Sequence, residues 1–61
     1  MQDKRFISTE ELSELLDIPA PSIATWRFRG EGPKYLKLGR HVRYDVSDVE
    51  QWLRERTREA K

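Results

Sequence analysis

The feature that most constrains the fold is a capping box at Ser8-Thr9-Glu10-Glu11, because it marks where a first helix begins. The Ser8 hydroxyl can accept a hydrogen bond from the Glu11 N–H, and the Glu11 side chain can reach back toward Ser8. The helix then carries one apolar stripe at helical spacing, made of Leu12, Leu15 and Leu16. Asp17-Ile18-Pro19 is predicted to end it.

A second helix is predicted to begin at Ala20 or Pro21, since proline is tolerated in the first turn. It should end at Gly30, which readily forms a left-handed cap. Ile23 and Trp26 share one face of this helix, and the opposite face carries Pro21, Ser22, Thr25 and Arg29. Two short helices joined by about four residues fit a helix-turn-helix, an outline that small helical bundles share.

The stretch KLGRHVRY, residues 37–44, alternates apolar and polar residues and predicts a β-hairpin. With a three-residue turn over Gly39-Arg40-His41, Leu38 faces Val42 and Leu36 faces Tyr44 on the buried side. Tyr35, Lys37 and Arg43 then lie on the exposed side, with Lys37 nearly opposite Arg43. Like charges across a strand pair are destabilising, so this pairing favours phosphates beside the two side chains.

A third helix is predicted after Ser47-Asp48-Val49-Glu50, interpreted as a second capping box. Val49, Trp52 and Leu53 should close the core over the hairpin, and the helical spacing of Trp26 and Trp52 favours core packing over base stacking. Phe28 either lies at the exposed edge of the second helix or packs under the loop that follows. The helix continues as a solvated face through Arg54, Arg56 and Arg58, for which contact with a partner is the alternative.

A short strand at Arg5-Phe6-Ile7 would lie beside the hairpin. The resulting order is helix, helix, hairpin, helix, an α+β fold that is mostly helical: a winged helix-turn-helix in which the hairpin is the wing. We expect a single domain over residues 1–61, with its core in 6–53 and a helical extension and tail in 54–61.

The 61-residue chain has a net charge of only +1, but the charge is unevenly distributed. Residues 1–18 have two basic and five acidic residues, a net charge of −3. Residues 19–44 have six basic residues and one acidic residue, a net charge of +5, and residues 45–61 have a net charge of −1. A basic middle third is typical of a surface that binds a polyanion.

Several function classes are disfavoured. The chain has no cysteine, and His41 alone cannot build a metal site. There is no catalytic triad that so small a domain could organise and no glycine-rich phosphate loop, so we expect no enzymatic activity, cofactor or small-molecule substrate. The N-terminus has no apolar signal core and no run approaches the ~20 apolar residues of a membrane span. We therefore expect a soluble, cytoplasmic protein.

Three segments, ISTEELSELLDI, WRFRGEGP and YLKLGRHVRYDVSDVEQWL, resemble the phage excisionases, small winged helix-turn-helix proteins that include recombination directionality factors and AlpA-like activators. The group is similar in fold to the DNA-binding end of MerR-type regulators. The resemblance covers residues 6–53 and is most specific over residues 26–44. It implies that the second helix enters the DNA major groove and that the wing tip at Gly39-Arg40 reaches the minor groove or its phosphates. It also implies a nucleoid-associated protein in the cytoplasm of a bacterial host cell.

The start of the second helix departs from this family. Relatives commonly place Ser and then polar or basic residues there, whereas this chain has Pro19-Ala20-Pro21-Ser22. Ser22 and Thr25 remain as candidate base readers, and Ala20, Pro21 or Ala24 could contact a thymine methyl. We expect weak direct readout, supplemented by phosphate contacts, DNA shape and neighbouring protomers. The predicted DNA-binding residues are Ala20, Pro21, Ser22, Thr25, Arg27 and Arg29 on the helix and Lys37, Gly39, Arg40, His41 and Arg43 on the wing.

Three hypotheses follow. The first is an architectural protein of excisionase type that binds and bends attachment-site DNA, cooperates with neighbouring copies and directs a tyrosine or serine integrase toward excision. The second is an AlpA-like transcriptional regulator at a promoter. The third is a protein-interaction module with a basic face. The residues themselves indicate only binding of double-stranded DNA, and the resemblance implies the excision role.

Overall fold

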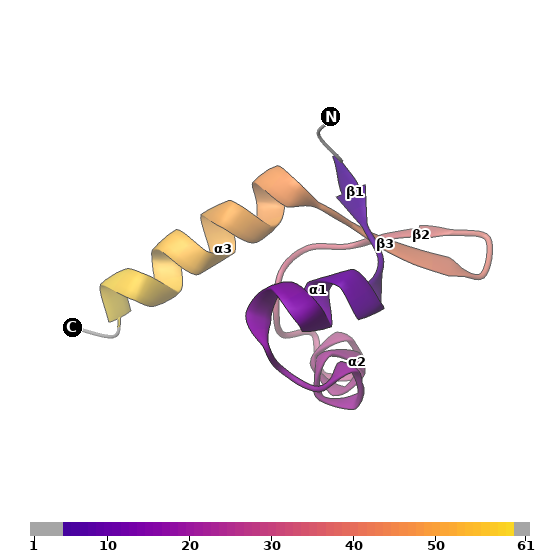
Figure 1. Cartoon of the computed structure of the whole chain (residues 1–61), viewed down its shortest axis with the longest axis horizontal. Helices are drawn as coiled ribbons and strands as arrows, with labels where there is room; N and C mark the ends of the chain where they lie inside the picture. Colours follow the sequence, from indigo (N-terminus) through magenta and orange to yellow (C-terminus); the bar gives the residue numbers. More distant parts are fainter. Residues whose placement is uncertain (1–4, 60–61) are drawn as a thin grey trace.

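The computed structural model describes residues 5–59 of the chain, and the side chains of residues 5–57. Within these residues, three helices and a three-stranded antiparallel sheet form a winged helix-turn-helix. The elements follow one another as β1 (Phe6–Ile7), α1 (Thr9–Leu16), α2 (Ala20–Arg29), β2 (Leu36–Leu38), β3 (His41–Asp45) and α3 (Val46–Glu59). In Figure 1 the β2–β3 wing and α3 extend in opposite directions from the packed centre.

The predicted capping box of α1 is confirmed. The Glu11 N–H donates to Ser8 Oγ over 3.0 Å, and the Ser8 N–H donates to Glu11 Oε1 over 2.9 Å. The helix ends at Asp17, which takes the left-handed conformation with φ 58°. The Ser13 hydroxyl then donates to the Ile18 carbonyl over 2.6 Å and ties down the turn into α2. This local hydrogen bonding sets the angle at which α2 leaves α1.

The predicted bounds of α2 are also confirmed, from Ala20 to a left-handed Gly30 with φ 74°. Pro19 occupies the N-cap position and offers no side-chain hydrogen bond. Gly32 follows in a tight loop, where an added Cβ would lie 2.9 Å from Trp26 Cε3. A glycine is therefore required for the loop to pass over the Trp26 ring.

The predicted register of the wing is wrong by one residue. Leu36 pairs with Arg43, Lys37 with Val42 and Leu38 with His41, so the turn contains two residues, Gly39 and Arg40. Gly39 has a φ of 66° and Arg40 has a negative φ, as in a type II′ hairpin turn. A one-residue slip moves side chains to the opposite face. Lys37 and Arg43 thus lie on opposite faces, and the like-charge argument built on their pairing does not hold.

The sheet order is β1-β3-β2, and the predicted N-terminal strand pairs with β3 through Phe6–Asp45 and Ile7–Tyr44. By this pairing, Tyr44, Val42, Lys37 and Ile7 share the face that meets the helices. Tyr44 is buried as predicted, but the predicted burial of Leu36 and Leu38 is wrong. They lie on the outer face, 44 % and 55 % exposed.

The predicted second capping box is likewise wrong, because α3 begins at Val46 and Ser47 lies inside it. Asp45 performs the capping role: its Oδ1 accepts from the Ser47 N–H over 2.9 Å and from the Ser47 hydroxyl over 2.7 Å. Asp45 Oδ2 accepts from Arg5 Nε over 3.1 Å, which joins the first strand to the same site. One carboxylate thus begins α3 and anchors the sheet edge.

A small core unites these elements. Its buried members come from β1, α1, α2, β3 and α3, one from each: Ile7, Leu12, Ile23, Tyr44 and Val49. Trp26 and Leu53 pack against this centre as predicted, and the Trp26 and Trp52 ring centroids lie 5.4 Å apart. Leu15, predicted in the apolar stripe of α1, is 60 % exposed. Between residues 5 and 59, no helix combines the length and apolar character needed to cross a membrane.

Candidate nucleic-acid interface

The solvent face of α2 is the part of the helix-turn-helix available to a groove. Ile23 is fully buried and Trp26 partly buried, which defines the inner side of the helix. Pro21, Ser22 and Thr25 are exposed on the opposite side. Ala20, also a predicted contact, is half-buried. The predicted readers therefore occupy the outer face, with Ala20 at its margin.

Little of this outer face can donate a hydrogen bond. The Thr25 hydroxyl donates to the Pro21 carbonyl over 3.0 Å, so its proton is used within the helix. Ser22 keeps a short hydroxyl, and Arg29 contributes an exposed guanidinium in the last turn. The face is mostly apolar up to its C-terminal end.

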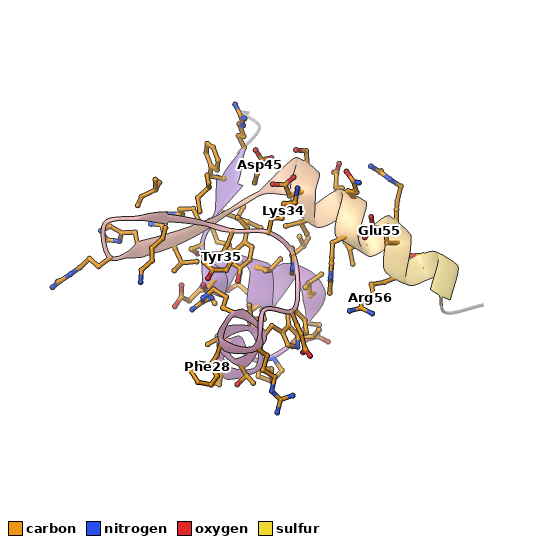
Figure 2. The ribbon with its side chains drawn as sticks, turned by 180° about the vertical axis from the view of Figure 1, so that it is seen from behind. Phe28, Lys34, Tyr35, Asp45, Glu55 and Arg56 are labelled. Carbon is orange, nitrogen blue, oxygen red and sulfur yellow. The ribbon has the colours of Figure 1, made fainter. Side chains whose placement is uncertain are left out.

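Phe28 belongs to this outer face and is 91 % exposed. Figure 2 shows its ring projecting from α2, away from the loop after the helix. The alternative in which Phe28 packs under that loop is therefore wrong. The seven residues that separate Phe28 from Pro21, two helical turns, place both on the same side. Phe28 is not among the predicted DNA-binding residues, although its helical spacing from Pro21 was enough to place it on this face.

Arg27, predicted as a phosphate contact, forms hydrogen bonds within the protein. Its Nη1 donates to Thr9 Oγ1 over 3.0 Å and to Tyr44 Oη over 3.1 Å. The guanidinium also lies 5.9 Å from the Tyr35 ring centroid. Arg27 thus joins α1, α2 and β3 and is half-buried, whereas Arg29 is exposed.

The wing tip presents its polar groups around the Gly39-Arg40 turn. Arg40, His41 and Lys37 are exposed. Apart from Gly39 and its two chain neighbours, no residue that the structure describes has an atom within 4 Å of the position of a Gly39 Cβ. Arg43 is half-buried, and its Nη1 donates to the Val42 carbonyl over 2.7 Å. This bond holds the Arg43 side chain along β3. The wing therefore offers one exposed guanidinium, that of Arg40, and one that is hydrogen-bonded to the backbone, that of Arg43.

A shallow hollow of about 250 Å³ lies where α1, α2 and the wing meet. Three arginines from α2 and the wing line it, together with one carboxylate, that of Glu10. The full lining is Thr9, Glu10, Arg27, Arg40, His41, Val42 and Arg43. Three guanidinium groups facing one carboxylate make the hollow electropositive, which suits a phosphate.

The wing and β1 place apolar side chains on the outer sheet face. Phe6 is 38 % exposed there, and the exposed Leu36 and Leu38 lie on the same face, on the other side of β3. The Arg5 guanidinium lies 5.1 Å from the Phe6 ring centroid. The outer face of the sheet is thus partly apolar.

Asp45 controls how the wing joins α3. The hydrogen bonds from the Ser47 hydroxyl and N–H, and then that from Arg5, lower the Asp45 pKa below its ordinary value of 3.8. The carboxylate is therefore held charged at the start of α3, where a negative charge also interacts favourably with the helix dipole. Within residues 5–57, no group of three or more His, Cys, Asp or Glu side chains is arranged to hold a metal ion.

Comparison with known proteins adds one match. A family model described as a helix-turn-helix domain matches residues 6–57, most of the chain. No curated protein matches. The matched segment spans β1, both helices of the motif, the wing and most of α3.

Proposed function

Because this chain belongs to the helix-turn-helix domain family, and that motif binds DNA, we propose that it binds duplex DNA with α2 in the major groove and the wing on the phosphate backbone. The observation that carries the proposal is the electropositive hollow lined by Arg27, Arg40 and Arg43. It connects the side of α2 to the wing tip. A phosphate strand passing between the two elements would be held there.

We further propose an architectural role of excisionase type: binding and bending attachment-site DNA so that an integrase catalyses excision. Two features support it. The residues of the wing and the α2 segment resemble those of the excisionases, and the outer face of α2 offers few donors for stand-alone readout. A protein with weak base readout gains specificity from DNA shape and from neighbouring proteins.

The outer face of the sheet supports a second part of this proposal, that the chain also contacts a protein partner. Phe6, Leu36 and Leu38 expose apolar surface on the outer sheet face, which is not used to bury the core. Exposed apolar patches commonly mark protein contacts. An integrase or a neighbouring copy of this chain is the partner class that an excision complex would supply.

Salt dependence tests the DNA-binding proposal. The dissociation constant for a duplex is measured by fluorescence anisotropy between about 50 and 200 mM salt, where a protein that neutralises four to six phosphates gives a slope of log K against log salt of about −4 to −5. A flat dependence, or no duplex binding at the lowest salt, contradicts it and favours the protein-interaction module.

Reconstituted recombination tests the excision role. Attachment-site DNA, the cognate integrase and this protein are combined, and excision products are quantified with and without the protein. Equal excision in both reactions contradicts the excisionase role and leaves a promoter-bound regulator of AlpA type as the alternative. Bending is measured in the same system by energy transfer between the duplex ends.

A further inference from the structure

Phe28 is the most exposed large apolar side chain among those that the structure describes, and it lies on the proposed groove face. Packing does not explain it, because the residue is 91 % exposed and Ile23 is the buried residue of α2. Burial of an aromatic side chain is favourable, so an exposed one is available to bury surface against a partner.

The residues next to Phe28 on α2 indicate which kind of partner would contact it. Pro21, Thr25 and Phe28 recur at helical spacing on one side of α2 and together form an apolar strip. The Thr25 hydroxyl donates to the Pro21 carbonyl, so the exposed Thr25 side chain has a methyl group and oxygen lone pairs to offer but no free proton. The strip can therefore contact apolar groups but can donate few hydrogen bonds.

Charge around the strip favours a nucleic acid over an apolar protein. Arg29 is exposed next to Phe28, and the hollow lined by Arg27 and Arg40 lies on the wing side of α2. A polyanion that approaches these guanidinium groups would bring its groove to the strip. The one apolar group in the DNA major groove is the thymine C5-methyl, which Ala, Thr and Phe side chains contact.

We propose that Phe28 is a specificity-determining residue that contacts a thymine C5-methyl in the major groove, with Pro21 and the Thr25 methyl extending the same apolar strip. The strip then recognises T·A pairs by their methyl groups in place of the bidentate hydrogen bonds of a polar recognition helix. This inference rests on the proposed binding of duplex DNA by α2.

The test begins with selection. Duplexes with a randomised central segment are selected by the wild-type chain and by the variants Phe28→Ala and Leu15→Ala. Leu15 is the matched control, because it is also an exposed apolar residue but lies on α1. Wild type and Leu15→Ala should select thymine at the same position, and Phe28→Ala should lose the preference there.

The selected thymine is then replaced by uracil, which removes only the methyl group. Wild type should bind the uracil duplex about fourfold more weakly, the worth of one buried methyl, whereas Phe28→Ala should bind both duplexes equally. Phe28→Leu should retain part of the difference, since it keeps an apolar side chain. Circular dichroism confirms that each variant is folded.

The outcomes separate the two proposals. Duplex binding with the same thymine-to-uracil ratio in wild type and Phe28→Ala overturns the role of Phe28 and leaves DNA binding intact. A loss of affinity in Phe28→Ala that is equal for both duplexes also overturns it. Absence of duplex binding by the wild-type chain at low salt overturns the proposed function, and the inference with it.

Discussion

The wing and α2 are adjacent parts of the same candidate surface, but their side chains differ in kind. The wing carries Lys37, Arg40 and Arg43 around a turn of two residues. The outer face of α2 carries Ser22 and the apolar strip of Pro21, Thr25 and Phe28. Phosphate contacts position a protein on DNA and base contacts specify the sequence. The difference indicates that affinity and specificity reside on separate elements.

Arg27 belongs to neither group. It shares the hollow with the wing arginines, yet its guanidinium is hydrogen-bonded to Thr9 and Tyr44. It therefore holds the two elements in their relative position. Substitutions on the wing should therefore change DNA affinity, substitutions on the outer face of α2 should change sequence preference, and substitution of Arg27 should change the stability of the fold.

Removal of the wing charge should have the largest effect. In the double variant Arg40→Ala and Arg43→Ala, two phosphate contacts are lost, and at a slope of about −0.9 per contact binding at 0.15 M salt should weaken by about 30-fold. All duplexes should be affected alike, and the salt slope should become shallower by about two. Anisotropy titrations measure both.

Arg54→Ala is the matched control, since it removes an exposed arginine from α3, away from the hollow. Equal losses in the control and the wing variant would contradict the assignment of the wing to the phosphates. A change of preferred site in the wing variant would reverse the roles of the wing and α2.

Removal of the Arg27 side chain, which joins α2 to α1 and β3, should lower stability more than removal of an exposed arginine. Arg27→Ala leaves the Tyr44 and Thr9 hydroxyls without this partner, and we expect the free energy of unfolding to fall by about 1–2 kcal/mol. Urea unfolding followed by circular dichroism measures the change. Arg29→Ala, in the same helical turn but exposed, should change it by less than about 0.5 kcal/mol. Equal stability of the two variants would show that the Arg27 network does not stabilise the fold.

Removal of the Ser22 hydroxyl should alter specificity alone. In Ser22→Ala one polar contact to a base is lost, and discrimination at one base pair should fall by about 1 kcal/mol, or about fivefold. Affinity for unrelated duplexes should stay unchanged. The measurement is competition between the selected site and its single-base variants. A uniform loss over all sites would place Ser22 on the phosphate backbone.

Substitution of Asp45 should have the smallest effect, which should appear as a pH dependence of the melting temperature. Its pKa is lowered in the folded state, so its contribution to stability is present above the ordinary value of 3.8 and is lost as the pH falls below it. Asp45→Asn can still cap α3 but has no charge to lose. The difference in melting temperature between wild type and Asp45→Asn should therefore shrink between neutral pH and about pH 3.

Asp48→Asn controls for the change in net charge, since Asp48 also lies in the first turn of α3. A difference between wild type and Asp45→Asn that is independent of pH would contradict the role given to the Asp45 hydrogen bonds.

The helix boundaries of the motif were predictable because they depend on contacts between near neighbours. The Ser8–Glu11 box spans three residues, and Gly30 adopts its left-handed cap without side-chain strain. The existence of a wing also followed from alternation within a few residues. The uneven charge and the shortage of donors on α2 were visible from composition and helical spacing.

The errors arose where local patterns allowed two solutions. A turn of three residues and a turn of two both fit KLGRHVRY, although a glycine followed by another residue is a known two-residue turn signal. The cap of α3 was predicted at Ser47, whereas the structure has it at Asp45, whose carboxylate also accepts from Arg5 next to the β1–β3 pairing.

The sequence alone therefore determined the order of elements, the ends of α1 and α2 and the basic middle of the chain, because helix caps and periodicity operate over a few residues. Only the tertiary structure decided which faces those elements present. The wing register puts Lys37 and Arg43 on opposite faces, and hydrogen bonds to α1 and β3 hold Arg27 half-buried. The burial of Ile23 leaves Phe28 on the exposed side of α2. Each of these depends on contacts between residues far apart in the chain, which local propensity does not encode.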